Sequence, residues 1–404
     1  MSTRLVTLIC AIFALAYAAA FVKKAQGPDG LILDAQGRPQ LTDHLSLWAA
    51  GRLATEGRPA AAYDWPAHAA AMADAMGRQP QSQLQFSYPP SFLLVMAPLS
   101  HLPFWASFAL LSILTLIPFP LIASRILGRP DAAVWMLATI PPFWNLCVGQ
   151  TGALAATLLA AGLLLLPARP LLAGAMLGLL TFKPHLGLLV PIALIASGQF
   201  RAIAAAAATT LLLASLSLAI HGAEPWLAFI ASLQKFGAFA MADTNATAFK
   251  MQSLFGLLRT LGLPAQPALA AQAILALALA ALTWHLWRRP GPHDLKAAAL
   301  LASAVLVTPY AFHYDLTMLT LAQAFLLRHA LAPAPAAHAE IPQRELVIVL
   351  AVNALIMLFP PLSFPTGFLA SLVLLAALLH RLETEAPGAL PRLAWPRLPA
   401  LPAR

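Results

Sequence analysis

Long apolar runs, separated by short polar turns, follow one another along almost the whole chain. A helix that crosses the hydrocarbon core of a bilayer needs about 20 apolar residues, so the runs are candidate membrane-spanning helices, although several of them are short. The candidate spans are 5–22, 103–124, 131–148, 151–167, 170–182, 184–197, 202–221, 267–287, 296–312, 314–328, 346–360 and 365–380. The pattern therefore predicts an all-α polytopic membrane protein with about 10–12 transmembrane helices.

Positive charges are concentrated in alternate turns between these spans. In membrane proteins the cytoplasmic turns carry an excess of Lys and Arg. The pattern therefore predicts a protein of the inner (cell) membrane with both termini in the cytoplasm. Two longer loops, about 23–102 and 222–266, then lie on the non-cytoplasmic side. A cleaved signal peptide is the alternative for the first segment, because Arg4 precedes an apolar run that ends in small residues.

The composition supports a membrane protein and excludes several other classes. Charged residues make up 10% of the chain, against about 25% in soluble domains. The formal charge of +9 comes from scattered Lys and Arg without aromatic interleaving, so we do not expect nucleic-acid binding. Two cysteines, both in apolar segments, provide no disulfide framework or metal site. We expect a single transmembrane domain over 1–386, no metal and no cofactor, and a disordered Pro/Arg-rich cytoplasmic tail over 387–404.

An isolated acid, Asp43, lies in the stretch "LTDHLSLWAAG" at 41–51. The pattern after it predicts a short amphipathic helix on the membrane surface. Thr42 or Asp43 could be the N-cap of this helix, so Asp43 is either a cap or a catalytic carboxylate, and the stretch alone does not decide between them.

Two further polar positions lie at the ends of apolar runs. Tyr88 precedes two prolines in "QFSYPPSFLLVMAPLSHLP" at 85–103, which predicts a rigid junction between a loop and a helix. Gln150 lies between two predicted spans, where a polar side chain needs a partner. We interpret both residues as lining a cavity, with a helix-packing role as the alternative for Gln150.

Lys183 follows an apolar run that is too short to cross the bilayer. Residues 170–182 rise only about 20 Å as a helix, so Lys183 is predicted to lie below the outer surface. An ionisable side chain at this depth is costly and usually pairs with an anion or faces a wet cavity. We favour a lysine that binds a lipid phosphate over one that extends to the interface, since Lys binds phosphate as a compact charge.

His313, Tyr314 and Asp315 form a second ionisable group in "TPYAFHYDLTMLTLA", 308–322. A structural hydrogen-bonded cluster is the alternative to a site. With Asp43 and Lys183, these residues all fall on the outer face under one topology. Their convergence predicts a site at the outer membrane interface.

The chain resembles the glycosyltransferase family 87 proteins, integral-membrane enzymes of the GT-C class, from about residue 41 to 330. The resemblance rests on the order and spacing of "DHLSLWAAG", "AAYD", "SYPPSFLLVMAPLSHLP", "GQTGALAATLLAAGLLL", "AGAMLGLLTFKPHLGLLVPIAL" and "PYAFHYDL". In this family an aromatic comes soon after the acid, whereas here Trp48 follows it by five positions.

The resemblance implies a GT-C-like fold and transfer of a hexose, often mannose, from a polyprenyl-phosphate donor on the non-cytoplasmic side. The acceptor would be a lipid or a glycan. The resemblance also implies that Asp43 is the general base. A single carboxylate base suits inverting transfer. Lys183, aided by His313, would stabilise the donor phosphate, and Tyr88, Gln150, Tyr314 and Asp315 would line the cavity.

Another class of protein is compatible with the same pattern. A transporter or flippase of lipid-linked sugars would also use Pro-broken helices and a buried lysine. Such transporters tend to have repeated halves with charges at the midplane, and no internal repeat is evident here. The sequence contains no paired aspartates of the kind that bind a nucleotide-sugar and a divalent metal, so a metal-independent mechanism is expected.

Overall fold

A computed structural model of the chain describes residues 1–25, 30, 32–40, 42–242, 248–332 and 340–387, without the side chains of 235–242. Over these ranges the chain is helical and forms no strand, only isolated bridges. The predicted all-α class is therefore confirmed. Most of the predicted tail, 387–404, lies outside the described residues, as does Leu41.

Within the described ranges, six helical stretches are long and apolar enough to cross a membrane. They are α1 (Thr3–Ala25), α5 and α6 (Phe104–Leu116 and Pro118–Leu127), α12 (Phe200–His221), α15 (Ala265–Arg288), α18 and α19 (Gln343–Met357 and Phe359–Leu362), and α20 (Thr366–Glu385). Large apolar side chains on their outer faces remain exposed, for example Leu211 and Leu277. Outward-facing apolar surface of this kind suits contact with lipid, and the protein is an integral membrane protein.

The other predicted spans are shorter or broken helices. They are α7 (Ala132–Leu137), α8 (Ile140–Val148), α9 (Gly152–Leu165), α10 (Pro170–Leu179), α11 (Val190–Ala196), α16 (His293–Leu306) and α17 (Thr317–Leu331). Helices α9, α16 and α17 pack against one another and are buried along nearly their whole length. Because other helices surround them, their ends need not match the bilayer thickness. Among the described residues, six stretches have the length of full spans, and these shorter helices account for the remaining predicted spans.

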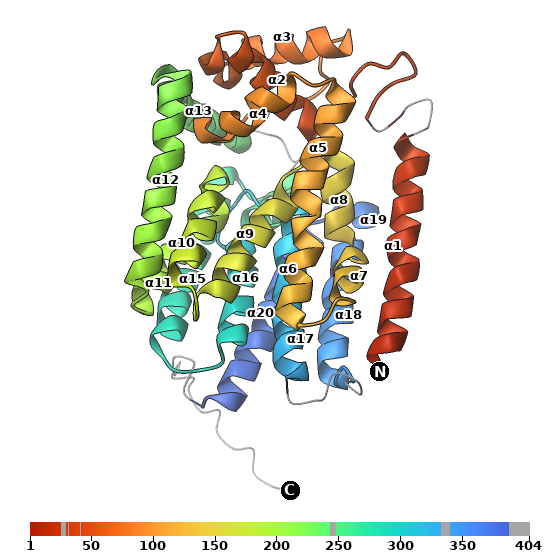
Figure 1. The fold of residues 1–404 in the computed structure, drawn as a ribbon, viewed down its shortest axis with the longest axis vertical. Helices are drawn as coiled ribbons and strands as arrows, with labels where there is room; N and C mark the ends of the chain where they lie inside the picture. The colour runs from red at the N-terminus through yellow and green to blue at the C-terminus, as the bar shows by residue number, and fades with distance from the viewer. Residues whose placement is uncertain (26–29, 31, 41, 243–247, 333–339, 388–404) are drawn as a thin grey trace, which may run out of the picture.

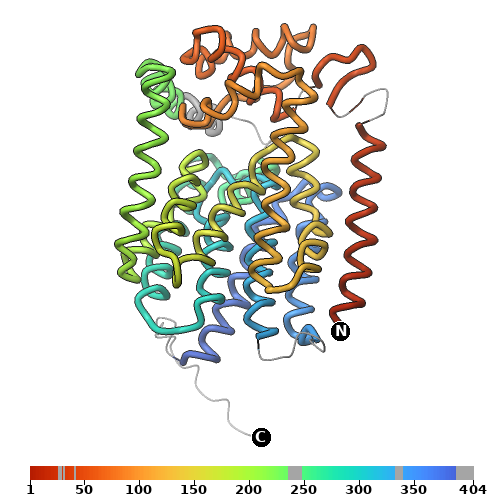
Figure 2. Tube along the Cα trace, viewed as in Figure 1, coloured from red at the N-terminus to blue at the C-terminus, as the bar shows by residue number. Residues whose placement is uncertain are grey.

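Small residues allow two of these helices to approach closely. α10 packs along α12, and a Cβ atom added at Gly174 would lie 2.2 Å from the carbonyl oxygen of Ala202. Helix–helix contacts in membranes depend on such small residues, because lipid offers no hydrophobic drive for association. α1 lies at the edge of the bundle, where it packs mainly against α7 (Figure 2).

A layer of short helices covers one end of the bundle (Figure 1). This end layer consists of α2 (Asp43–Thr55), η1 (Pro59–Tyr63), α3 (Trp65–Met76), η2 (Pro90–Phe92) and α4 (Leu93–Ser100). The loop predicted at 23–102 is thus largely helical. α2 is buried on nearly all sides by this layer, which differs from the amphipathic surface helix predicted from its sequence.

The predicted loop 222–266 also contains helices: α13 (Glu224–Ala242), η5 (Ala248–Lys250) and α14 (Leu254–Thr260). α13 packs against η1 of the end layer. α1 begins and α20 ends at the opposite end of the bundle (Figure 1). Three single-turn helices, η3 (Leu180–Phe182), η4 (Pro184–Gly187) and η6 (His313–Leu316), interrupt the bundle below the end layer.

We expect Gly152→Ala to destabilise the protein. The added methyl group would lie 2.3 Å from the carbonyl oxygen of Tyr314, so the start of α9 would have to move. Overpacking of this kind typically costs about 1–3 kcal/mol, and the thermal midpoint of the purified protein should fall. Gly187→Ala is the control, because its nearest neighbour lies at an ordinary 3.6 Å. Equal midpoints for the two variants would contradict this account.

Candidate active site below the end layer

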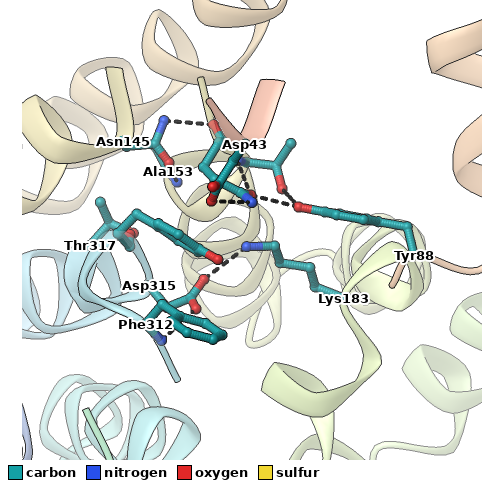
Figure 3. A network of polar contacts seen from close by, with 11 residues as sticks. Asp43, Tyr88, Asn145, Ala153, Lys183, Phe312, Asp315 and Thr317 are labelled. Carbon is teal, nitrogen blue, oxygen red and sulfur yellow. Dashed lines mark hydrogen bonds and ion pairs between the residues drawn. The ribbon is translucent and has the colours of Figure 1, made fainter. Parts of the chain in front are cut away.

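Five segments that are distant in sequence bring polar side chains together below the end layer (Figure 3). They are the start of α2, the turn before η2, the α8–α9 junction, the η3–η4 junction and η6. Proline explains two of these positions: Pro89 and Pro90 start η2, and Pro184 separates η3 from η4. Proline lacks an N–H donor and fixes φ, so it ends one helix and positions the next.

Asp43 is the first residue of α2. Its carboxylate Oδ2 accepts a hydrogen bond from Gln150 Nε2 at 3.0 Å. Thr42 is the N-cap residue, and no side chain caps the start of the helix. The geometry therefore gives Asp43 a partner across the bundle rather than the capping role that its sequence allowed.

The environment of Asp43 opposes its ionisation. Its side chain keeps some exposure to solvent, yet protein surrounds it closely, and burial raises the pKa of the carboxyl above its ordinary value. The Gln150 hydrogen bond and the positive charges of Lys183 and Lys250 act in the opposite direction. A carboxylate whose pKa is moved towards neutrality is a stronger base than an ordinary surface aspartate.

The amide of Gln150 is held in one orientation. Its Oε1 accepts hydrogen bonds from the Tyr88 hydroxyl at 2.6 Å and from the Thr151 backbone N–H at 3.1 Å. Asn145 Nδ2 donates to the Gln150 carbonyl oxygen at 2.8 Å, which fixes the backbone. With its oxygen occupied by two donors, Gln150 directs its NH₂ group at Asp43.

Tyr88 is fixed by stacked aromatic rings. Its ring lies 4.5 Å from that of Phe92 and is parallel to that of Phe182, at 1°. Its backbone carbonyl accepts a hydrogen bond from the Tyr63 hydroxyl at 2.9 Å. Its own hydroxyl also lies 2.8 Å from Thr151 Oγ1. These contacts hold Tyr88 at the centre of the site.

Lys183 and Asp315 form a buried ion pair. Lys183 Nζ donates to Asp315 Oδ1 at 2.9 Å, and the side chains are 5% and 1% exposed. The other oxygen of Asp315 accepts from the Phe312 backbone N–H at 3.0 Å. Two charges removed from water require such mutual compensation, because the desolvation cost is several kcal/mol per ion.

Aromatic rings cover the ammonium group of Lys183. Nζ lies 4.7 Å from the ring centroid of Tyr314 and 5.9 Å from that of Tyr88. Tyr88 therefore connects the two halves of the site, because its hydroxyl contacts Gln150 while its ring lies near Lys183 (Figure 3). We name Asp43, Tyr88, Gln150, Lys183, Tyr314 and Asp315 the polar site.

His313 does not belong to the polar site, although it belongs to the same sequence cluster. Its Nε2 lies 3.4 Å from the Ile356 carbonyl oxygen, and its ring stacks on Phe359 at 4.6 Å. Trp144 contacts the ring edge at 5.7 Å. The side chain thus faces α8, α18 and α19, and its role at the donor phosphate stays a prediction.

Sequence reasoning missed His185, which follows Lys183 by two positions. It is close enough to Lys183 and Asp315 to interact electrostatically with both. Its position in "KPH", two residues after the predicted phosphate-binding lysine, could have identified it as a site residue. Charged residues of the 222–266 loop also lie near the site or outside the described residues. Lys250 acts electrostatically on Asp43, whereas Asp243 and the side chain of Lys235 lie outside the described residues.

The described part of the chain contains no group of three or more His, Cys, Asp or Glu side chains that could hold a metal ion. The polar site instead provides a partly accessible carboxylate, an oriented amide, a buried cation and two tyrosines. This set can accept a proton at one end and balance negative charge at the other.

We expect Lys183→Met to destabilise the protein more than a double variant that also carries Asp315→Asn. The single change leaves the Asp315 carboxylate buried without its cation, which typically costs about 3–5 kcal/mol. The double change removes both charges and keeps an oxygen for the Phe312 N–H. Thermal unfolding of the two purified variants measures the difference, and a double variant as unstable as the single one would contradict the pairing.

A family model describes much of the region that forms the site. The model of glycosyltransferase family 87 matches residues 86–309, more than half of the chain. The match includes Tyr88, Gln150 and Lys183, whereas Asp43 and Asp315 lie outside it. No curated protein and no solved structure matches the chain. The resemblance seen in the sequence is confirmed, and the chain belongs to glycosyltransferase family 87, a family of membrane glycosyltransferases.

Proposed function

We propose that the protein transfers a hexose, such as mannose, from a polyprenyl-phosphate donor to a lipid or glycan acceptor with inversion at the anomeric carbon. The observation that carries this proposal is the arrangement around Tyr88. A carboxylate, Asp43, lies on its hydroxyl side, and a buried ammonium, Lys183, lies near its ring. An inverting transfer needs a base for the acceptor and a counter-charge for the leaving group.

Asp43 is the proposed general base. The acceptor hydroxyl oxygen attacks the anomeric carbon while its proton passes to the Asp43 carboxylate. The bond between the anomeric carbon and the phosphate oxygen breaks, and its electron pair leaves with the lipid phosphate. Gln150, held by Tyr88 and Thr151, keeps the carboxylate oriented through its NH₂ group.

Lys183 is the proposed partner of the leaving phosphate. The phosphate gains negative charge as the bond to the sugar breaks, and a nearby cation stabilises this developing charge. Asp315 holds the ammonium group in place at 2.9 Å, and the rings of Tyr88 and Tyr314 shield it from water. A preorganised cation in a water-excluded site is more effective than one in solution.

The proposed topology places the end layer on the non-cytoplasmic side and both termini in the cytoplasm. Charged side chains at the opposite end of the bundle support it. Arg328 pairs with Asp294 at 3.4 Å, and Arg381 pairs with Glu345 at 3.3 Å. Basic residues at the helix ends away from the end layer agree with the positive-inside rule. Membership of a glycosyltransferase family favours this function over the transporter alternative.

We expect Asp43→Asn to abolish transfer of labelled sugar from polyprenyl-phosphate-mannose, because an amide cannot accept the proton. Membranes that express wild-type protein should retain transfer in EDTA. Asp74→Asn is the matched control, since Asp74 is an exposed carboxylate on α3 of the same end layer. Transfer that persists in Asp43→Asn at equal protein level would contradict the assignment of the base, and loss of wild-type transfer in EDTA would contradict a metal-independent mechanism.

We also expect the rate to fall at low pH as Asp43 becomes protonated. Burial raises the pKa of Asp43, so the rate should fall at a pH above the ordinary aspartate pKa of about 3.9. The Gln150 hydrogen bond favours the ionised form, so Gln150→Leu should raise the pKa of Asp43 further and move the fall to higher pH. The pH profile of kcat/KM measures both effects. An identical profile in Gln150→Leu would show that the amide does not act on the base.

A further inference from the structure

A cavity lies between the end layer and α13, apart from the polar site. It has a volume of about 240 Å³ and lies between η1, α3, the segment before η2 and α13. The residues that matter here are Tyr63, Trp65, His68, Gln85, Phe86 and Ser232. The cavity is smaller than the clefts of about 300–1,000 Å³ that hold drug-sized ligands. It therefore fits one compact ring of a larger molecule.

Aromatic side chains form the apolar part of this cavity. The rings of Tyr63 and Phe86 lie 5.5 Å apart, and Tyr63 also contacts Phe229 of α13 at 5.7 Å. Trp65 is half-buried and lies 6.5 Å from the His68 ring, at a steep angle of 72°. Rigid aromatic surface of this kind contacts the apolar C–H face of a sugar ring without losing much conformational freedom.

His68 is a buried polar residue of the lining. It is 1% exposed, and its Nε2 lies 2.9 Å from the Ser46 carbonyl oxygen. A carbonyl oxygen only accepts, so Nε2 carries the proton and the neutral ring keeps a lone pair on Nδ1. Nδ1 has no hydrogen-bond partner among the described residues. Nδ1 is itself buried, so we assign it no contact with a ligand, and His68 adds a neutral ring to the lining.

The remaining polar lining is uncharged. The amide of Gln85 is half-buried, and Ser232 Oγ donates to the Phe229 carbonyl oxygen, which leaves its own lone pairs available. Neither Lys nor Arg is among the described residues that line the cavity. A phosphate or carboxylate would find no counter-charge among these residues. Aromatic faces with neutral donors and acceptors instead suit a polyhydroxylated, uncharged ring.

We propose that this cavity binds one pyranose residue of the acceptor, so that the acceptor is a saccharide or carries one. This inference rests on the proposed function. It distinguishes acceptor from donor by position: Tyr63 lines the cavity and donates to the Tyr88 carbonyl oxygen, whereas Lys183 lies near the ring of Tyr88. The acceptor residue would thus bind on the end-layer side of Tyr88, and the donor phosphate on the Lys183 side.

Binding can be tested without transfer. Purified Asp43→Asn protein is mixed with methyl α-D-mannopyranoside or methyl β-D-glucopyranoside, and saturation-transfer NMR detects the bound sugar. Trp65→Ala removes an aromatic face, and Gln85→Ala removes a half-buried amide; both are introduced in the Asp43→Asn background. Gln83→Ala is the matched control, because Gln83 lies in the same segment, is exposed and does not line the cavity.

We expect a signal from Asp43→Asn that survives Gln83→Ala and is lost in both cavity variants. In the transfer assay, Trp65→Ala and Gln85→Ala introduced singly into the wild-type protein should raise the acceptor KM by about tenfold, the effect of losing roughly one good contact, with the donor KM unchanged. Equal signals in all variants, or no signal from either sugar, would overturn the proposal. If the sugar signal depends on the cavity but the wild-type protein transfers no sugar, the saccharide site stands and the proposed function is refuted instead.

Discussion

The buried ion pair between Lys183 and Asp315 is the constraint on which the rest of the site depends. Neither charge could remain in this apolar bundle alone, because desolvation would exceed what the surrounding helices offer. Each is therefore positioned by local structure as well as by its partner. Pro184 ends the helical segment behind Lys183, and the Phe312 N–H holds the second oxygen of Asp315. The bundle is interrupted at η3–η4, where Lys183 lies, and at η6, which contains Asp315.

Tyr88 extends this fixed pair into a site that has two chemically different sides. Its ring lies near the ammonium group, and its hydroxyl orients Gln150, which in turn contacts Asp43. The Tyr88 side chain thus lies between the proposed base, Asp43, and the cation, Lys183. The same residue is tied through its carbonyl to Tyr63 in the end layer. A ligand bound in that layer would then be positioned relative to the base by a short chain of rigid groups.

The sequence predicted the helical class and the unusual position of Lys183, because each follows from local pattern and helix length. It could not predict that Lys183 pairs with Asp315, which is 132 positions away. Nor could it predict which way His313 faces, since adjacent residues of η6 turn in different directions. α2 was predicted as a surface helix from its own amphipathic pattern, but packing within the end layer covers its polar side as well. The central helices α9, α16 and α17 are close in length to the runs that predicted them, but the sequence could not show that other helices surround them in place of lipid.

The anomeric configuration of the product tests the central claim most directly. One carboxylate base and one displacement require that the new glycosidic bond has the opposite configuration to the bond that breaks. Purified protein is supplied with a polyprenyl-phosphate-mannose donor of β configuration, and NMR of the isolated product gives the configuration at the transferred sugar. The account predicts an α-linked product. A β-linked product would contradict a single displacement with Asp43 as the base.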